Sequence, residues 1–359
     1  MNIIDRLARF PSFPTCSLPT PLQSVPRLRA ALGDCSPTIL IKRDDLTGLA
    51  AGGNKARKLA WLIGDALNVS ADTLITCGAA QSNHALQTVA AAGLAGMSAR
   101  CVLYGSPEQE GARLVGNLHL HHILGTRIRW VRMGQGETRR EQALRRGLAE
   151  EEAAAQTAGL RPYVIPTGGS TAIGALGYVH ASHEIHAQLD GMEPKAIYFA
   201  SGSGGTQAGL MVGCAIAGIS ASLEGVEVDS IPPDASGVSP YRRAVRTIAN
   251  AASALMELPA GFTDSDVLLR PEFSGPAYGA RTPEAEEAIE LTARTEGIFL
   301  DPVYTGKAMS ALISDVRAGR YRADDSVIFW HTGGLAGLFA REPARIRQAG
   351  GGEDGGSRG

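Results

Sequence analysis

Ile41-Lys42-Arg43-Asp44-Asp45 and, shortly after it, Gly52-Gly53-Asn54-Lys55 form the stretch that says most about how this chain folds. The apolar residues up to position 41 predict a short buried strand, and the residues after Asn54 repeat apolar side chains at helical spacing. The lysine therefore stands at the start of a helix, directly behind two glycines. The positive end of the helix dipole favours the neutral form of its amine, which is the form that acts as a nucleophile.

Strands and helices alternate along most of the remaining chain. We expect strands at 38–41, 73–76, 101–104, 128–131, 196–200 and 327–330, and helices at 55–67, 82–92, 113–124, 137–158 and 206–219. This alternation predicts an α/β fold built on mainly parallel sheets. The proline-rich first thirty residues are expected to be extended and loop-rich, and the glycine-rich tail at 346–359 is expected to be a flexible coil.

The composition is that of a soluble globular protein with two domains. With 359 residues the chain exceeds one ordinary hydrophobic core, and 44% of its residues are hydrophobic and 19% charged. A net charge of -2 provides no basic field for nucleic acid, no apolar run approaches a membrane span, and the amino terminus lacks the order of a signal peptide. The charge and the lack of long apolar runs therefore predict no nucleic-acid or membrane partners, and the five scattered cysteines predict reduced thiols in a cytoplasmic protein.

A second glycine-rich segment, Ser201-Gly202-Ser203-Gly204-Gly205-Thr206-Gln207, follows a predicted strand and opens a predicted helix. Backbone N–H groups at such a helix start can hold a phosphate, and the hydroxyls of the segment can add further donors. A plain glycine turn is the alternative. Nucleotide-binding patterns fit less well, because GxGxxG would need glycine at position 207 and a P-loop over 48–53 would be interrupted by Asn54.

The segment Gln81-Ser82-Asn83-His84 is a polar turn between a predicted strand and a predicted helix. Its backbone N–H groups can receive a carboxylate, although Ser82 could also cap the helix without any ligand. A reactive lysine, a phosphate cradle and a carboxylate site together indicate pyridoxal 5'-phosphate (PLP) held as a Schiff base by Lys55, with a small amino acid as substrate. The alternative for Lys55 is an exposed helix lysine, the usual state of this residue type.

Seven segments make the chain similar to a known family. In order from residue 41 to residue 334 they read IKRDDLTGL-x-x-GGNKxRKL, QSNH, SGSGGTQAGL, GPAYG, ARTEG, LDPVYTGKAM and HTGG. The set resembles the PLP enzymes that include D-cysteine desulfhydrase and 1-aminocyclopropane-1-carboxylate (ACC) deaminase, over nearly the whole chain except the tail. The resemblance implies the tryptophan-synthase-β-like fold, called PLP fold type II, with two domains that each contain a mainly parallel sheet flanked by helices. It also implies a homodimer.

Within this fold, the large PLP-binding domain would comprise residues 1–57 and 173–345, and the small inserted domain residues 58–172. The resemblance assigns cofactor binding to Lys55, Asn83, Ser203, Gly204, Gly205, Thr206 and Thr332. Lys55 would form the Schiff base, Asn83 would hydrogen-bond the phenolic oxygen, and Thr332 would face the pyridine nitrogen. The segment 203–206 would hold the phosphate.

The substrate side is implied in the same way. The substrate carboxylate would be received by Ser82, Asn83 and His84, while Tyr278 and Tyr304 would line the space beside it. The α-proton would be removed by Lys55, or by Ser82 assisted by a tyrosine. The resemblance therefore implies four catalytic residues, which are Lys55, Ser82, Tyr278 and Tyr304.

Two threonines guide the choice of reaction within the family. ACC deaminases carry glutamate at the position of Thr305, against the pyridine nitrogen, and tend to carry leucine at the position of Thr332. A carboxylate there keeps the ring protonated and makes it the strong electron sink that ring opening requires. Expulsion of a good leaving group such as hydrosulfide tolerates the weaker sink that neutral hydroxyls provide. His84, where the deaminases commonly have glutamine, agrees with this choice.

We therefore predict α,β-elimination on a small β-substituted amino acid, with D-cysteine converted to pyruvate, hydrogen sulfide and ammonia. Sulfite release from L-cysteate, and conversion of ACC to 2-oxobutyrate and ammonia, remain alternatives within the family. The alternative from another class is a non-catalytic binding protein with the same fold. Loss of the lysine or of the phosphate cradle would have favoured it, and both are present.

The histidines do not form a recognisable metal-binding pattern. His180, His183 and His186 recur at every third position of a predicted helix, and His183-Glu184-Ile185-His186 is one residue short of the HExxH motif. A second group of histidines lies on another charged helix, where adjacent side chains diverge. We predict polar helix faces and no catalytic metal.

Overall fold

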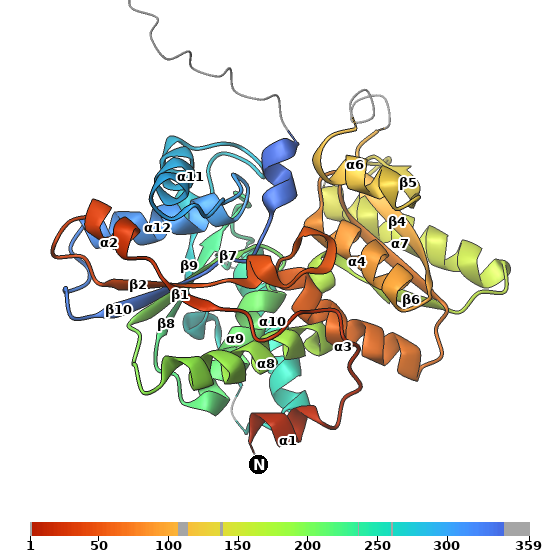
Figure 1. The fold of residues 1–359 in the computed structure, drawn as a ribbon. Helices are drawn as coiled ribbons and strands as arrows, with labels where there is room; N and C mark the ends of the chain where they lie inside the picture. Colours follow the sequence, from red (N-terminus) through yellow and green to blue (C-terminus); the bar gives the residue numbers. More distant parts are fainter. Residues whose placement is uncertain (1, 107–113, 137–138, 236, 260, 341–359) are drawn as a thin grey trace, which may run out of the picture.

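The computed structural model describes residues 2–106, 114–136, 139–235, 237–259 and 261–340, which form two α/β lobes side by side (Figure 1). The larger sheet has the strand order β1-β2-β10-β7-β8-β9, and only β1 runs antiparallel to its neighbour. Its strands are β1 (Leu22–Ser24), β2 (Thr38–Lys42), β7 (Ala196–Ser201), β8 (Ser222–Glu227), β9 (Leu269–Arg270) and β10 (Ser326–Trp330).

The second sheet is fully parallel and has the order β5-β4-β3-β6. Its strands are β3 (Thr73–Ala79), β4 (Ser98–Tyr104), β5 (Arg127–Val131) and β6 (Pro162–Ile165). All four lie in the sequence between β2 and β7, so the second lobe is inserted into the chain of the first. The prediction of an α/β fold with mainly parallel sheets is confirmed. The domain limits at 57/58 and 172/173 stay a prediction, and the tail at 346–359 lies outside the described residues.

Helices cover the faces of both sheets (Figure 1). Those around the larger sheet are α2 (Pro26–Ala31), α8 (Ala172–Leu189), α9 (Gly205–Ala217), α10 (Pro240–Leu255), α11 (Pro283–Glu296) and α12 (Thr305–Arg317). Those of the inserted lobe are α3 (Asn54–Asn68), α4 (Asn83–Leu94), α6 (Gly116–Ile123) and α7 (Arg140–Thr157). The amino-terminal helix α1 (Ile3–Leu7) packs against α8. Among the described helices, none is long and apolar enough to cross a membrane.

The apolar strand residues explain why both faces of the larger sheet are covered. Successive strand side chains point to opposite faces, so Ile41 and Phe329 pack with α11 and α12, whereas Leu40 and Ile328 pack with α8 and α9. Strands buried on both faces read as continuous apolar runs rather than as alternating ones. This is the pattern seen in the sequence at β2, β7 and β10.

Two local details differ from expectation. The region of the first thirty residues contains α2, which begins at Pro26, because proline is well accommodated in the first turn of a helix. The helix expected over 113–124 is shorter, spanning Gly116–Ile123, and position 113 lies outside the described residues.

The carboxyl ends of the parallel strands carry the segments singled out in the sequence. These segments follow β2 (Asp44), β3 (Ser82), β7 (Ser203) and β10 (Thr332), and the loop after β6 (Gly168) lies at the same edge. In open α/β sheets, ligands bind at this edge of the strands. The fold therefore directs five loops, from two sheets, to one region.

Candidate active site

Lys55 is the second residue of α3, and the loop before it is pressed against the end of β10. Gly53 has φ 123°, and a Cβ there would lie 2.9 Å from the carbonyl oxygen of Thr332. Gly333 has φ 88°, and a Cβ there would lie 2.5 Å from the Gly53 Cα. The Asn54 N–H donates to the Thr332 carbonyl at 3.0 Å. Only glycines permit this close approach, which sets Lys55 beside Thr332.

A short hydrogen-bond chain links the Lys55 amine to the phosphate cradle. Lys55 Nζ donates to Asn54 Oδ1 at 2.8 Å, and Asn54 Nδ2 donates to Thr206 Oγ1 at 2.9 Å. Burial lowers the pKa of Lys55 from 10.5 to about 8, and the Asp301 carboxylate partly opposes this shift. The lowered pKa agrees with the expectation from the helix dipole that the amine is partly neutral, but its largest cause is the burial of the side chain. Lys55 is therefore a partly neutral amine near physiological pH.

The predicted cradle is closed by a loop that the sequence did not indicate. Gly204 caps α9 with φ 89°, and the Gly205 N–H points at Ser170 Oγ, 3.2 Å away. Ser170 Oγ in turn donates to Ser203 Oγ at 2.7 Å. A Cβ on Gly205 would lie 2.8 Å from Lys58 Nζ. Hydroxyls, backbone N–H groups and one amine thus converge at the start of α9.

Lys58 places a buried amine beside the predicted phosphate cradle. Its side chain is buried, and Nζ donates only to the Gly168 carbonyl at 3.1 Å and to Ser170 Oγ at 3.3 Å, with no carboxylate partner among the described residues. Burial, and then the charge of Lys55, lower its pKa well below 10.5. A buried amine without a counter-charge, beside a helix amino terminus, fits a bound phosphate. The signal in the sequence was its spacing of three from Lys55, on the same helix face.

The polar turn caps α4, and its side chains point in different directions. Ser82 Oγ accepts from the Ala85 N–H at 3.2 Å, so the capping alternative is correct for this side chain. Asn83 Oδ1 accepts from Asn117 Nδ2 at 2.7 Å, an orientation that directs the Asn83 amide nitrogen elsewhere. The N–H groups at the start of α4 lie close to the lysine loop, because Gln87 Nε2 donates to the Gly52 carbonyl at 2.8 Å.

His84 turns its ring into the interior of the inserted lobe. Nε2 lies 2.8 Å from Thr76 Oγ1, and the side chain is buried. Burial, with the nearby lysines, lowers the pKa of His84 well below 6.5, so the imidazole is neutral. Only its backbone can face the space between the lobes, which is the role that the sequence analysis considered for it.

Tyr278 and Tyr304 are brought together from separate loops. Their hydroxyls hydrogen-bond each other, and the ring centres lie 6.1 Å apart at an interplanar angle of 73°. Burial raises the pKa of both phenols, so the pair is neutral at physiological pH. The pair is tied to the lysine region through Asp301, whose Oδ2 accepts from the Tyr304 N–H at 3.0 Å.

Asp301 is a second site residue that the sequence analysis did not single out, although it lies within the LDPVYTGKAM segment. Its buried carboxylate accepts from the N–H groups of Val303 at 2.8 Å and Thr305 at 2.9 Å, at the start of α12. The Thr305 hydroxyl donates to Asp301 Oδ1 at 2.9 Å and accepts from the Asp301 N–H at 2.8 Å. Thr305 is thus a neutral residue whose hydroxyl orders this loop.

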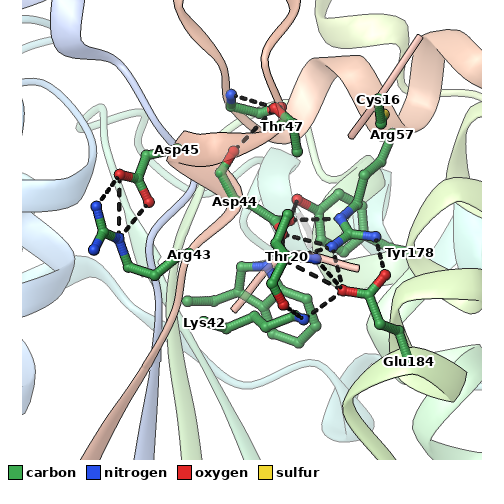
Figure 2. Close-up of polar contacts among 12 residues, drawn as sticks. Cys16, Thr20, Lys42, Arg43, Asp44, Asp45, Thr47, Arg57, Tyr178 and Glu184 are labelled. Carbon is green, nitrogen blue, oxygen red and sulfur yellow. Dashed lines mark hydrogen bonds and ion pairs between the residues drawn. The ribbon is translucent and has the colours of Figure 1, made fainter. Parts of the chain in front are cut away.

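A buried ionic network around Arg57 anchors the first turn of α3 (Figure 2). Arg57 Nη2 lies 2.7 Å from Asp44 Oδ1 and 2.9 Å from Glu184 Oε1. Asp44 Oδ2 also accepts from Trp330 Nε1 and from the Tyr178 hydroxyl, each at 2.7 Å. This single carboxylate therefore joins the end of β2 to α3, α8 and β10. The lysine helix is held against the large sheet by these contacts.

The comparisons with known proteins agree with this arrangement. The family model "Pyridoxal-phosphate dependent enzyme" matches residues 15–333. The D-cysteine desulfhydrase of Klebsiella pneumoniae (strain 342) is 42% identical over 345 residues, which cover 95% of this chain and 99% of that protein. A crystal structure of an ACC deaminase homologue is 36% identical, with a TM-score of 0.82 over 94% of this chain and 96% of that chain.

A crystal structure of a PLP-dependent aspartate racemase shares the fold at 15% identity, with a TM-score of 0.60 over 92% of this chain and 93% of that one. These matches and the two mainly parallel sheets confirm PLP fold type II and PLP as the cofactor. The donors around Lys55, Lys58 and Gly205 suit a phosphate-bearing aldehyde. The chain belongs to the family of pyridoxal-phosphate-dependent enzymes.

Proposed function

We propose that this enzyme eliminates the β-substituent of a small amino acid, converting D-cysteine to pyruvate, hydrogen sulfide and ammonia. The observation that carries the proposal is the similarity to D-cysteine desulfhydrase along 95% of the chain. The neutral Thr305 supports it, because a strongly protonated ring is not needed to expel sulfur. The 36% identity to an ACC deaminase homologue keeps ring opening as the second candidate.

In this proposal Lys55 would hold the cofactor covalently and Asn83 would donate to its phenolic oxygen. Ser203, Gly204, Gly205 and Thr206 would bind its phosphate together with the buried amine of Lys58. Thr332 would face the pyridine nitrogen. When bound, PLP supplies the electron sink for the pair released at the substrate Cα.

The remaining residues orient the substrate and move its protons. The N–H groups at the start of α4, from Ser82 to His84, receive the substrate carboxylate at the positive end of the helix dipole. Lys55 removes the Cα proton, since its lowered pKa keeps part of the amine unprotonated. Ser82, assisted by a tyrosine, is the alternative base. The Tyr278–Tyr304 pair faces the β-substituent with neutral hydroxyls.

We also propose that the enzyme works as a cytoplasmic homodimer, with domains at 1–57 plus 173–345 and at 58–172. The family resemblance supports the dimer, and the unpaired state of all five cysteines supports a reducing compartment. Sedimentation of the PLP-loaded protein tests the assembly, and a mass of 37.5 kDa at all concentrations would contradict a dimer.

The pH dependence of cofactor capture should report the lowered pKa of Lys55. Only the neutral amine attacks an aldehyde, so the capture rate of apoprotein should rise about tenfold per pH unit below the pKa and level off above it. We expect the plateau to begin near pH 8, the value to which burial lowers the Lys55 pKa. The rate is followed by the violet absorbance of bound PLP. A free lysine derivative is the control, and a protein profile that follows it to near pH 10.4 would contradict the assignment.

The substrate is tested with purified, PLP-loaded protein given D-cysteine, L-cysteine, L-cysteate and ACC separately. Pyruvate and sulfide from D-cysteine are the expected products. Sulfite from L-cysteate, or 2-oxobutyrate from ACC as the only product, would replace the proposal by the corresponding alternative. Tight PLP binding with no turnover of any amino acid would favour the non-catalytic binding protein.

A further inference from the structure

Arg140 is the first residue of α7, and it reaches from the inserted lobe to the large one. Its guanidinium carbon lies 4.8 Å from the centre of the Tyr278 ring, and Nη2 lies 3.3 Å from Asp229 Oδ2. Asp229 follows the carboxyl end of β8, while Arg140 follows the loop at the carboxyl end of β5. One side chain therefore connects the facing edges of the two sheets beside the tyrosine pair.

The contacts of Arg140 with Tyr278 and Asp229 contribute too little to folding stability to give this residue a structural role. Its side chain is 38% exposed, and an ion pair or ring contact of this kind contributes little to folding stability. The position of the guanidinium points to a role in the site. It places a permanent positive charge on the face of Tyr278, whose hydroxyl bonds that of Tyr304.

The charges around the tyrosine pair otherwise disfavour ionisation. Burial raises the pKa of Tyr278, and the carboxylates of Asp301 and Asp229 act in the same direction. Arg140 is the charged residue that opposes them at both Tyr278 and Tyr304. A phenol that gives up a proton in such a site needs a cation to stabilise the remaining phenolate.

We propose that Arg140 is a positioning residue for the leaving-group proton: it holds Tyr278 against Tyr304 and stabilises the phenolate formed when the pair protonates the departing sulfur. The proposal rests on the proposed elimination. The electron pair of the Cα–H bond forms the Cα–Cβ double bond, and the C–S bond breaks with its pair leaving on sulfur. The phenolic proton moves to sulfur as the C–S bond breaks, so that sulfur departs as hydrogen sulfide. Lys55 holds the proton taken from Cα, and solvent then reprotonates the tyrosine.

The choice of leaving group tests this role. Chloride needs no proton to depart, so 3-chloro-D-alanine can be eliminated without the acid, whereas proton donation speeds the departure of the more basic hydrosulfide from D-cysteine. We expect Arg140→Gln to lower kcat for D-cysteine by roughly 10- to 100-fold and to change kcat for 3-chloro-D-alanine less than about threefold, as loss of acid assistance predicts. Arg140→Lys keeps the charge and should restore most of the D-cysteine rate.

Arg145→Gln is the matched control, because it removes the same charge from the same helix at a side chain that is 77% exposed and pairs with Glu141. It should behave as the wild type with both substrates. Equal losses with both substrates in Arg140→Gln, or no rescue by lysine, would overturn the proposal. If the wild type turns over neither substrate, the proposed elimination fails, and this failure is seen before any variant is made.

Discussion

Replacing Lys55 with alanine is expected to abolish turnover and the violet absorbance of the PLP-loaded protein. The amine is both the covalent attachment point and the expected base, so its loss removes two functions at once. We expect kcat to fall by at least about 10⁴-fold, the upper range for loss of a proton-transferring group. Product formation and absorbance are measured on the same samples.

Lys195→Ala is the control for this experiment, because that side chain is 61% exposed and lies 3.8 Å from Asp325, away from the site segments. It should retain both absorbance and activity. Full activity in Lys55→Ala would remove the basis for every role assigned above.

Arg57→Met is expected to lower the free energy of unfolding by about 3–5 kcal/mol, the usual cost of removing one partner of a buried ion pair. The variant leaves the carboxylates of Asp44 and Glu184 in an apolar interior without their shared cation. Burial by itself would raise the pKa of Asp44, but the charge and hydrogen bonds of Arg57 hold it below its usual value. Urea unfolding of the apoprotein measures the change without a contribution from the cofactor.

Arg145→Met is the matched control, because it breaks the exposed pair with Glu141 and should change the free energy of unfolding by less than about 0.5 kcal/mol. The pH dependence gives a second readout. Arg57 and Lys42 overcome the effect of burial and lower the pKa of Glu184 to about 2. This stabilisation is present above pH 4.5 and is lost as the pH falls towards 2. The loss should be smaller in Arg57→Met, and equal slopes would contradict the role of Arg57.

The elements that carry the cofactor motifs could be predicted from local sequence. The apolar runs at β2, β7 and β10 are buried on both faces, so composition alone identifies them as strands. The glycines before Lys55 and at 204–205 mark places where the backbone approaches another group closely. These features depend on a few neighbouring residues and can therefore be predicted from the sequence alone.

Asp301 and Lys58 show what local sequence did not reveal. Both lie inside quoted motifs, yet their importance depends on burial and on partners from distant segments, such as Gly168 for Lys58. The sequence allowed Ser82 to cap a helix, to serve a ligand or to do both, and its hydrogen bond from the Ala85 N–H shows that it caps α4. Burial changes the pKa of a charged side chain and its need for a partner. Which charged side chains are buried is set by the fold and cannot be read from the local sequence.

By itself, the sequence determined the α/β class, and it predicted a reactive lysine and a phosphate cradle, because each follows from spacing or from glycine geometry over a short stretch. The tertiary structure decided how these parts meet. Residues from the carboxyl ends of the two sheets meet, and Arg140 of α7 lies against Tyr278 and Asp229. Such a meeting depends on the relative placement of two sheets, which is set by packing over the whole molecule rather than by any local run of residues.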